Sequence, residues 1–511
     1  MNGNSSTTCN QHESISDKRL SYEWSSIDWA KANRVVNRIQ TRIAKAVLVE
    51  NWNLVKRLQY LLTNSFYAKA IAVKRITSNT GKRTAGVDGI LWNTNTLKIK
   101  AIKELGKKGY KPLPLKRIYI DKPGKPDKRP LSIPTMKDRA MQALYLLALE
   151  PIAETTGDRI SFGFRKHRST HDAMEYIFKL LSRKNAPQWI IEGDIKGCFD
   201  NINHQYLLDN IPMDKSMLKK FISAGYIYKN RLFPNYDHGT PQGGIISPTL
   251  ANMTLDGMEN IIAKNFWTNK QGKIDKKHHN SYQINLVRYA DDFIVTTNIK
   301  EKAYEIKDVI ENFMSQRRLT LSANKTSITH IDKGFDFLGW EFRKHNGKLI
   351  VKPSKKSIKK VVNAISTIIK ENKASKQETL IKRLNSVITG WSNYHQPVCS
   401  KQTFNKIDHI IFQILWKWAK RRHPRKGLKW IKNKYWKICG NRKWVFKENE
   451  LNLKQMKDTP IVRHTPLILT KNVFTENDYF LQRQKKARRK RAIAYKESAV
   501  AHYIKSGLLN A

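Results

Sequence analysis

The chain is poor in cysteine and in long apolar runs. Of its 511 residues only four are cysteine (Cys9, Cys198, Cys399 and Cys439), and no two of them form a C-x-x-C pair. That scarcity argues against a disulfide framework and against the common zinc spacings, and it suits a reducing compartment. No apolar run approaches the roughly 18 to 20 residues that a membrane span needs. We therefore expect a folded protein with no membrane partner.

Acidic residues are also scarce relative to basic ones. Lysine and arginine total 95 against 42 aspartates and glutamates, which gives a formal net charge of +53. An excess of this size indicates a polyanionic partner. At 40% hydrophobic and 10% aromatic, the chain still has enough apolar material to bury a sizeable core.

The first 24 residues carry no recognisable targeting signal. They are rich in serine and asparagine, contain Glu13, Asp17 and Glu23, and have no apolar stretch. Neither a secretory signal nor an arginine-rich transit peptide has this composition. We expect a cytoplasmic, nucleoid-associated bacterial protein or, alternatively, one encoded and retained in a plastid or mitochondrion.

Hydrophobic periodicity divides the chain into helical and mixed regions. Residues 26–76 are expected to be amphipathic helices, with Arg38, Arg42 and Lys45 on the polar side. Short apolar runs at 118–120 and 131–133 predict two strands joined by the basic turn 122–126, and residues 189–297 mix strand and helix patterns. Beyond Pro353 the pattern is helical and basic again, and six of the 13 tryptophans fall between residues 391 and 444. This order predicts an α+β domain followed by a helical, basic module.

Three aspartates stand where apolar strands are expected to end. Asp291 and Asp292 interrupt the apolar stretch 285–297 at the likely turn of a hairpin, and Asp194 closes the run 189–191. A solvated turn and a helix N-cap are the alternatives for these two positions. Adjacent buried carboxylates need a compensating cation. Three of them on a very basic protein suit two Mg²⁺ ions about 3.5 to 4 Å apart, the arrangement for nucleotidyl transfer.

Eight blocks in order then carry a family resemblance. They are GVDG at 86–89, RPLSIP at 129–134 with KDR at 137–139, SFGFR at 161–165, residues 194–200, GTPQGG at 239–244, YADD at 289–292, LSANKT at 321–326 and FLGW at 337–340. The chain resembles the group II intron-encoded reverse transcriptase/maturase family. The resemblance implies a right-hand polymerase with fingers, palm and thumb, an antiparallel palm sheet and a helical maturase domain X.

By this resemblance the aspartates receive individual roles. Asp194 and Asp291 would be the principal metal ligands, Asp292 would support them, and the backbone carbonyl of Ile195 would complete one shell. The ions would be Mg²⁺, with Mn²⁺ as an alternative. Lys325 would lie where such polymerases place a proton donor for pyrophosphate, although an isolated lysine is more often solvated or bound to phosphate.

The resemblance also implies a nucleotide site. Phe199 would crowd the sugar 2′ position, unless it is an ordinary core phenylalanine. Gln242 would border the nucleotide sugar, with a plain glycine turn as the alternative. Lys122 and Arg129, or a neighbouring lysine in place of Lys122, would grip the triphosphate. The block at 337–339 resembles the primer grip, though it could equally be a strand and bend.

The C-terminal half resembles the thumb and maturase region. Basic residues and exposed aromatics together suit a folded RNA with loops, while buried tryptophans are the alternative for most of the six. The residues expected to contact RNA are Arg38, Arg42, Lys45, Lys356, Lys360, Arg421 and Arg422.

Five segments are expected. They are a polar leader at 1–25, a basic helical extension at 26–80, fingers and palm at 81–345, thumb and maturase domain at 346–450, and a basic C-terminal segment at 451–511. With no cysteine after Cys439, we expect no HNH endonuclease. The basic run 485–491 could contact target DNA, or it could be a solvated helical remnant.

The expected function is RNA-directed DNA synthesis on group II intron RNA, combined with maturase assistance to splicing and intron mobility. The alternatives are a non-catalytic splicing factor and a reverse transcriptase recruited by a host and no longer tied to an intron. The expected partners are the intron RNA, an RNA template with a DNA primer, target DNA and deoxynucleoside triphosphates. The sequence leaves the oligomeric state open, a dimer being one option.

Overall fold

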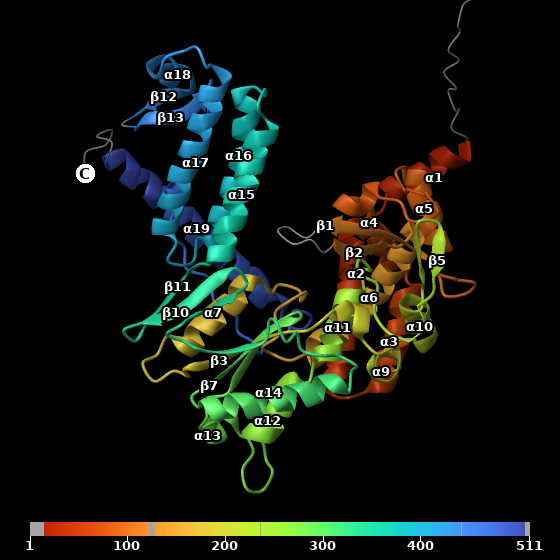
Figure 1. Ribbon diagram of the computed structural model, residues 1–511. Coiled ribbons are helices and arrows are strands. Elements are labelled where there is room, and N and C mark those ends of the chain that lie inside the picture. The colour runs from red at the N-terminus through yellow and green to blue at the C-terminus, as the bar shows by residue number, and fades with distance from the viewer. Residues whose placement is uncertain (1–14, 122–127, 236, 441, 506–511) are drawn as a thin grey trace, which may run out of the picture.

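A computed structural model describes residues 15–121, 128–235, 237–440 and 442–505. Helices α1 to α6 form one arm and α15 to α18 form another, and both stand on a central sheet with its helices (Figure 1). Lys122 and the turn around it lie outside the described residues, as does Cys9. Within the described part of the chain, no helix is long and apolar enough to cross a membrane.

The first arm is built from amphipathic helices around one buried helix. In α2 (Trp29–Leu48) the apolar positions Val36, Ile39 and Ile43 are buried, as their spacing predicts, and the Asp28 side chain caps the first turn by accepting from the Lys31 amide. The central helix α6 (Met136–Thr156) is buried along most of its length. The other elements of this arm are α1 (Ile15–Ser25), α3 (Trp52–Asn64), α4 (Phe66–Ser78), η1 (Thr80–Arg83) and α5 (Asn95–Glu104).

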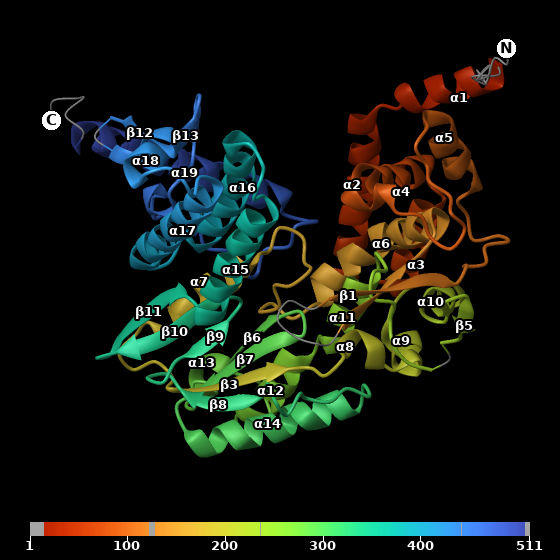
Figure 2. The ribbon, with the colours of Figure 1, turned by 45° about the horizontal axis from the view of Figure 1, so that its top comes forward.

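A small sheet lies beside these helices. Strands β1 (Leu115–Asp121) and β2 (Lys128–Ile133) pair antiparallel, as the sequence predicts, and β1 also pairs in parallel with β4 (Tyr226–Tyr228). The strand order is β2-β1-β4-β5, with β5 at Arg231–Phe233 (Figure 2). Four short helices accompany this sheet along the chain, three before β4 and one after β5. They are α8 (Cys198–Asn201), α9 (His204–Asn210), α10 (Lys215–Ile222) and α11 (Ser247–Leu255).

The central sheet is antiparallel throughout. Its order is β6-β7-β3-β8, formed by Asn285–Tyr289, Asp292–Thr297, Trp189–Asp194 and Ser327–His330. Alternate residues of β3 join different cores: Ile190 packs with residues of α7 (Thr170–Leu181), and Ile191 with residues of α14 (Lys300–Ser315). Both faces are therefore covered, which explains why these strands read as continuous apolar runs. Helices α12 (Met258–Phe266) and α13 (Lys276–His279) complete this part.

The second arm begins with a three-stranded sheet and continues as helices. Strands β9 (Phe335–Phe337), β10 (Trp340–His345) and β11 (Lys348–Pro353) lead into α15 (Lys355–Glu371), α16 (Gln377–His395), α17 (Lys401–Arg422) and α18 (Leu428–Tyr435). The sequence predicts a helical module here, but the structure adds a second sheet of β12 (Trp436–Cys439), β13 (Arg442–Glu448) and β14 (Leu451–Asn452). These strands form because Trp436 and Phe446 are buried against the helices.

The C-terminal segment runs back along the molecule. After η2 (Met456–Asp458) an irregular stretch leads to α19 (Asn477–Lys505). Phe474 and Phe480 are buried in a small core with Ala44 of α2. The basic run 485–491 lies on α19, and its lysines and arginines are exposed to solvent.

Candidate active site

The three aspartates meet at one edge of the central sheet. Asp194 is the last residue of β3 and Asp292 the first of β7, and they stand directly opposite one another in the ladder. Asp291 lies in the two-residue turn between β6 and β7, where Ala290 has a positive φ of 58°. A hairpin of this length requires such a conformation, so its geometry fixes the position of Asp291. The predicted turn and strand end are both present, and Asp194 is not an N-cap.

Crowding of the carboxylates shows in their pKa values. Partial burial, followed by the charges of Asp291 and Asp194, raises the pKa of Asp292 to about 7. Burial and the nearby Asp194 also raise the pKa of Asp291. Lys325 lies at the same edge, with its Nζ 2.6 Å from Oδ2 of Asp194, and this hydrogen bond raises the pKa of the lysine. Negative charge is therefore concentrated at this edge. Among the described residues, the ammonium group of Lys325 alone forms an ion pair with these carboxylates.

This donor set fits a divalent cation that binds together with a substrate. In the described ranges, no group of three or more His, Cys, Asp or Glu side chains is placed so that it could hold a metal ion by itself. Mg²⁺, however, usually takes one or two carboxylates and completes its shell with water and substrate phosphates. The oxygens available here are the carboxylates of Asp194, Asp291 and Asp292, and the carbonyl of Ile195 directly after β3.

Three further residues predicted from the sequence come together beside this edge. Gln242 donates through Nε2 to Oδ2 of Asp200 at 2.9 Å and accepts from Nε of Arg129 at 3.3 Å. The amide of Thr240 donates to the carbonyl of Phe199 at 2.6 Å, which ties the glycine-rich block to α8. Phe199, Gln242 and Arg129 thus come from three distant segments and lie in one neighbourhood.

Asp200 is a member of this group that sequence reasoning did not single out. Burial raises its pKa, while Arg117, Gln242 and Arg129 oppose that change. The guanidinium of Arg117 also stacks over the ring of Tyr226, 3.7 Å from its centroid. The signal was available, since Asp200 closes the motif that begins at Asp194.

A buried arginine supports the turn that carries Asp291. Arg288 on β6 has no exposed side-chain surface and pairs with Oδ1 of Asp256 at 2.5 Å. Nη1 of the same guanidinium donates to Oδ1 of Asn252 at 3.2 Å and, more weakly, to the carbonyl of Ala290 inside the turn at 3.5 Å. The Arg288 side chain therefore contacts the turn that carries Asp291 from the side of α11. No periodicity in the sequence marks this role, because its partners are 32 and 36 residues away.

The segment 161–165 presses against the same turn. A Cβ on Gly163 would lie 2.4 Å from the amide nitrogen of Ala290, so only glycine allows this approach. Asn252 donates to the carbonyl of Gly163 at 2.7 Å and so joins the segment to the Arg288 pair.

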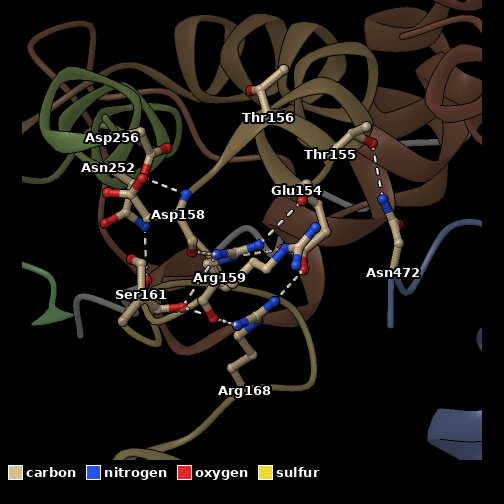
Figure 3. A network of polar contacts seen from close by, with 12 residues as sticks. Glu154, Thr155, Thr156, Asp158, Arg159, Ser161, Arg168, Asn252, Asp256 and Asn472 are labelled. Atoms are coloured by element: carbon tan, nitrogen blue, oxygen red, sulfur yellow. Dashed lines mark hydrogen bonds and ion pairs between the residues drawn. The ribbon is translucent and has the colours of Figure 1, made fainter. Parts of the chain in front are cut away.

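A second buried ion-pair group holds the loop before this segment. Figure 3 shows Glu154 and Arg168 on one side of the network and Asn252 and Asp256 on the other, with Asp158 between them. Glu154 accepts from Arg165 at 2.7 Å and from Arg168 at 3.0 Å, and all three side chains are buried. The amide of Asp158 donates to Asp256 at 3.3 Å, which links the two groups. A connected network of buried polar contacts thus lies behind the turn that carries Asp291.

A polar cleft opens beside the carboxylates. Its volume is about 580 Å³, and it extends from Asp194 and Asp292 past Lys325 to Leu338 and Lys356. Lys356, at the start of α15, also lies 3.8 Å from Asp336. The cleft therefore joins the catalytic edge, the β9–β10 hairpin and the base of the second arm.

The other residues expected to contact RNA have different surroundings. Arg38 and Arg42 line a groove on α2, and Lys45 and Lys360 are exposed on their helices. Arg421 is exposed at the end of α17. Arg422 is engaged within the protein, because it donates to the carbonyls of Lys373 and Ser375 and stacks on Trp418.

The six C-terminal tryptophans divide by exposure. Trp418 and Trp436 are buried in the core, and Trp391 and Trp416 are partly buried. Trp430 and Trp444 are 40% and 43% exposed and lie under lysine ammonium groups. These two rings can reach a partner, as the aromatic-basic pattern predicts.

Comparisons with known proteins agree with this geometry. Residues 120–342 match the family model described as reverse transcriptase (RNA-dependent DNA polymerase), residues 24–105 match the N-terminal domain of reverse transcriptase, and residues 358–436 match the maturase-specific domain of group II introns.

Among curated proteins the chain is 32% identical to protein YkfC of Escherichia coli over 60% of this chain and 87% of that protein. It is also 32% identical to the group II intron-encoded protein LtrA of Lactococcus lactis, over 56% of each chain. A third relative is a 91 kDa protein in the cob intron of Schizosaccharomyces pombe, 32% identical over 55% of this chain and 40% of that one. The match thus spans most of YkfC but only about half of LtrA.

Proposed function

The chain belongs to the group II intron-encoded reverse transcriptase/maturase family, and from this premise we propose that it copies group II intron RNA into DNA and also binds that RNA as a maturase. One observation supports the enzymatic half above all others. Three aspartates converge at one sheet edge, on a turn held by the buried Arg288. A non-catalytic RNA-binding protein has no need of such support. A polymerase does need it, because catalytic groups must stay close to their reactive positions.

In our proposal the aspartates hold two divalent cations. Asp194 and Asp291 are the principal ligands, Asp292 supports them, and the Ile195 carbonyl completes one shell. Two Mg²⁺ ions, or Mn²⁺ in their place, would activate the primer 3′-hydroxyl and stabilise the departing pyrophosphate.

The residues around Gln242 form the proposed nucleotide site. Arg129 can present a planar pair of donors to a phosphate, and Lys122, which lies outside the described residues, would add a point charge. Gln242, held between Arg129 and Asp200, would border the sugar. Phe199 would leave too little room for a 2′-hydroxyl, which selects deoxynucleotides.

Lys325 serves the leaving group in this scheme. Its ammonium already lies against Asp194 at the catalytic edge. A protonated lysine there can donate to the pyrophosphate oxygen as the bond breaks.

The maturase half would use basic surfaces on both arms. Arg38, Arg42 and Lys45 would contact the intron from the fingers side, and Lys356, Lys360 and Arg421 from the thumb side. Their contacts release counterions from the phosphate backbone. Arg422, which is bound to the carbonyls of Lys373 and Ser375, would support the thumb-side surface from within. Target DNA would be a further partner. The protein would work where its intron is transcribed, in a bacterial cytoplasm or in an organelle.

Primer extension with controlled metal tests the proposal. Purified protein is given an RNA template, a DNA primer and deoxynucleotides, first with EDTA and then with Mg²⁺ or Mn²⁺ added back. We expect no extension under chelation and full-length DNA after either metal is restored. Tight RNA binding with no extension under any metal would replace this proposal with the splicing-factor alternative.

A further inference from the structure

A two-residue turn faces the catalytic edge across the polar cleft. Leu338 and Gly339 connect β9 to β10 and have positive φ angles of 50° and 86°. Leu338 lines the same cleft as Asp194 and Asp292. In the proposed function, the end of the growing strand must occupy this cleft, so the turn contributes to its position.

Both carbonyl oxygens of the turn accept hydrogen bonds from residues later in the second arm. The hydroxyl of Tyr394, on α16, donates to the carbonyl of Leu338 at 2.8 Å. The backbone amide of Ser354, the N-cap of α15, donates to the carbonyl of Gly339 at 3.0 Å. Tyr394 of α16 and Ser354, where β11 passes into α15, therefore hold the turn between β9 and β10.

The two helices are themselves joined at this point. Ser357 of α15 accepts from Nε1 of Trp391 at 3.1 Å and contacts Nε2 of His395 at 3.1 Å. The ring of Tyr394 stacks on Trp340, with centroids 4.6 Å apart and planes 6° from parallel. This joint is closely packed, so a rotation of the helices must carry the turn with it. In Figure 2, α15 stands directly over the β9–β11 sheet.

We propose that Tyr394 and Ser354 are positioning residues that couple the orientation of the thumb to the place of the primer 3′ end. This inference rests on the proposed polymerase function. When nucleic acid draws the thumb helices inward, the turn moves with them and sets the distance between the primer end and the carboxylates. The chemical step is sensitive to this distance, because small displacements of reacting groups cost large factors in rate.

The substitution Tyr394→Phe tests the coupling. It keeps the stack on Trp340 and removes only the hydroxyl, which holds Leu338 and also contacts Thr170 at the start of α7. Losing one such hydrogen bond should lower kcat for single-nucleotide addition about 3- to 10-fold. We expect an unchanged KM for the deoxynucleotide, since its site lies at Gln242, and fewer nucleotides added per binding event.

Tyr435→Phe is the matched control. Its hydroxyl contacts His423 at 2.8 Å, in the same arm but away from the turn. We expect this variant to keep wild-type kcat. If Tyr394→Phe also keeps wild-type kcat and processivity, or if both variants lose activity equally, the coupling is refuted.

A second pair of variants addresses the other carbonyl. Ser354→Ala removes the cap side chain but keeps the amide, whereas Ser354→Pro removes both at a φ of −69° that proline adopts. We expect kcat to fall further in the proline variant than in the alanine variant. Equal kcat values would contradict the role of the Ser354 amide. A wild-type protein that does not extend a primer would overturn the proposed function together with the coupling, whereas normal wild-type extension and uncoupled variants would overturn the coupling alone.

Discussion

Single residues decide how the catalytic edge is held. The aspartates were predictable, because each closes an apolar run and the YADD block is a strong pattern. Arg288 stands in the adjoining position and was not recognised as support for the turn. Its role depends on Asn252, which lies in α11, and on Asp256, which directly follows that helix. No local pattern in the sequence reveals these contacts.

Breaking the buried Arg288–Asp256 pair should lower the free energy of unfolding substantially. Arg288→Met leaves Asp256 buried without its partner, and such losses cost about 3 to 5 kcal/mol. Denaturant unfolding measures the change, and we expect the double variant Arg288→Met/Asp256→Asn to recover part of it. The control is Arg318→Met, which breaks the exposed pair with Asp237 and should cost no more than about 1 kcal/mol. Equal losses of unfolding free energy in the two single variants would show that the Arg288–Asp256 pair stabilises the fold no more than an exposed pair does.

At the scale of elements, local patterns predicted most of the active-site framework. The β1–β2 hairpin, the strands around Asp194 and Asp291, and the amphipathic face of α2 all follow from period and turn residues. The sheet of β12, β13 and β14 did not follow, because its short strands alternate lysine with aromatics inside a helical context. Burial of Trp436 and Phe446 against α17 and α18 settles their conformation.

The approach of the segment 161–165 to the catalytic turn gives an element-level prediction. Gly163→Ala places a methyl group 2.4 Å from the Ala290 amide, so the turn must shift. We expect primer extension to fall at least about 10-fold, because a displacement of this kind moves Asp291. Gly390→Ala is the control, since nothing lies within 4 Å of its added Cβ and alanine favours the helix. Normal activity of Gly163→Ala would show that the turn tolerates movement.

Acid should lower the free energy of unfolding through His395, which is buried where α15 and α16 pack together. Burial, with the charge of His171 adding to it, lowers the pKa of His395 from 6.5 to about 3. Between these values the unfolded chain binds a proton that the folded chain does not, so stability is lost as the pH falls below about 6.5. The slope approaches about 1.4 kcal/mol per pH unit for one proton.

The pH dependence of unfolding in His395→Gln checks this assignment. We expect a shallower loss of stability between pH 7 and pH 5 than in the wild type. His409→Gln replaces an exposed histidine in the same arm and should keep the wild-type slope. Identical slopes in all three proteins would contradict a buried neutral His395.

At the scale of the whole molecule, the C-terminal segment connects the parts. Thr41 of α2 donates to the carbonyl of Phe474, Asn472 donates to Thr155 of α6, and Tyr495 donates to Asn393 of α16. Arg483 pairs with the buried Asp172 at the start of α7. The sequence indicated only a basic tail, because these partners lie up to 433 residues away. The segment therefore contacts both arms and the start of α7 beside the central sheet.

In the proposed function, the three aspartates make this chain a polymerase. Single-nucleotide addition to a primer on an RNA template tests it most directly, with wild type, Asp291→Asn and the exposed-acid control Asp308→Asn compared under Mg²⁺. The control keeps the same change of charge on the surface of α14. We expect wild type and Asp308→Asn to add the nucleotide equally, and Asp291→Asn to be slower by at least about 1,000-fold, the scale of losing a principal metal ligand's charge stabilisation. Equal rates in all three proteins would contradict the account.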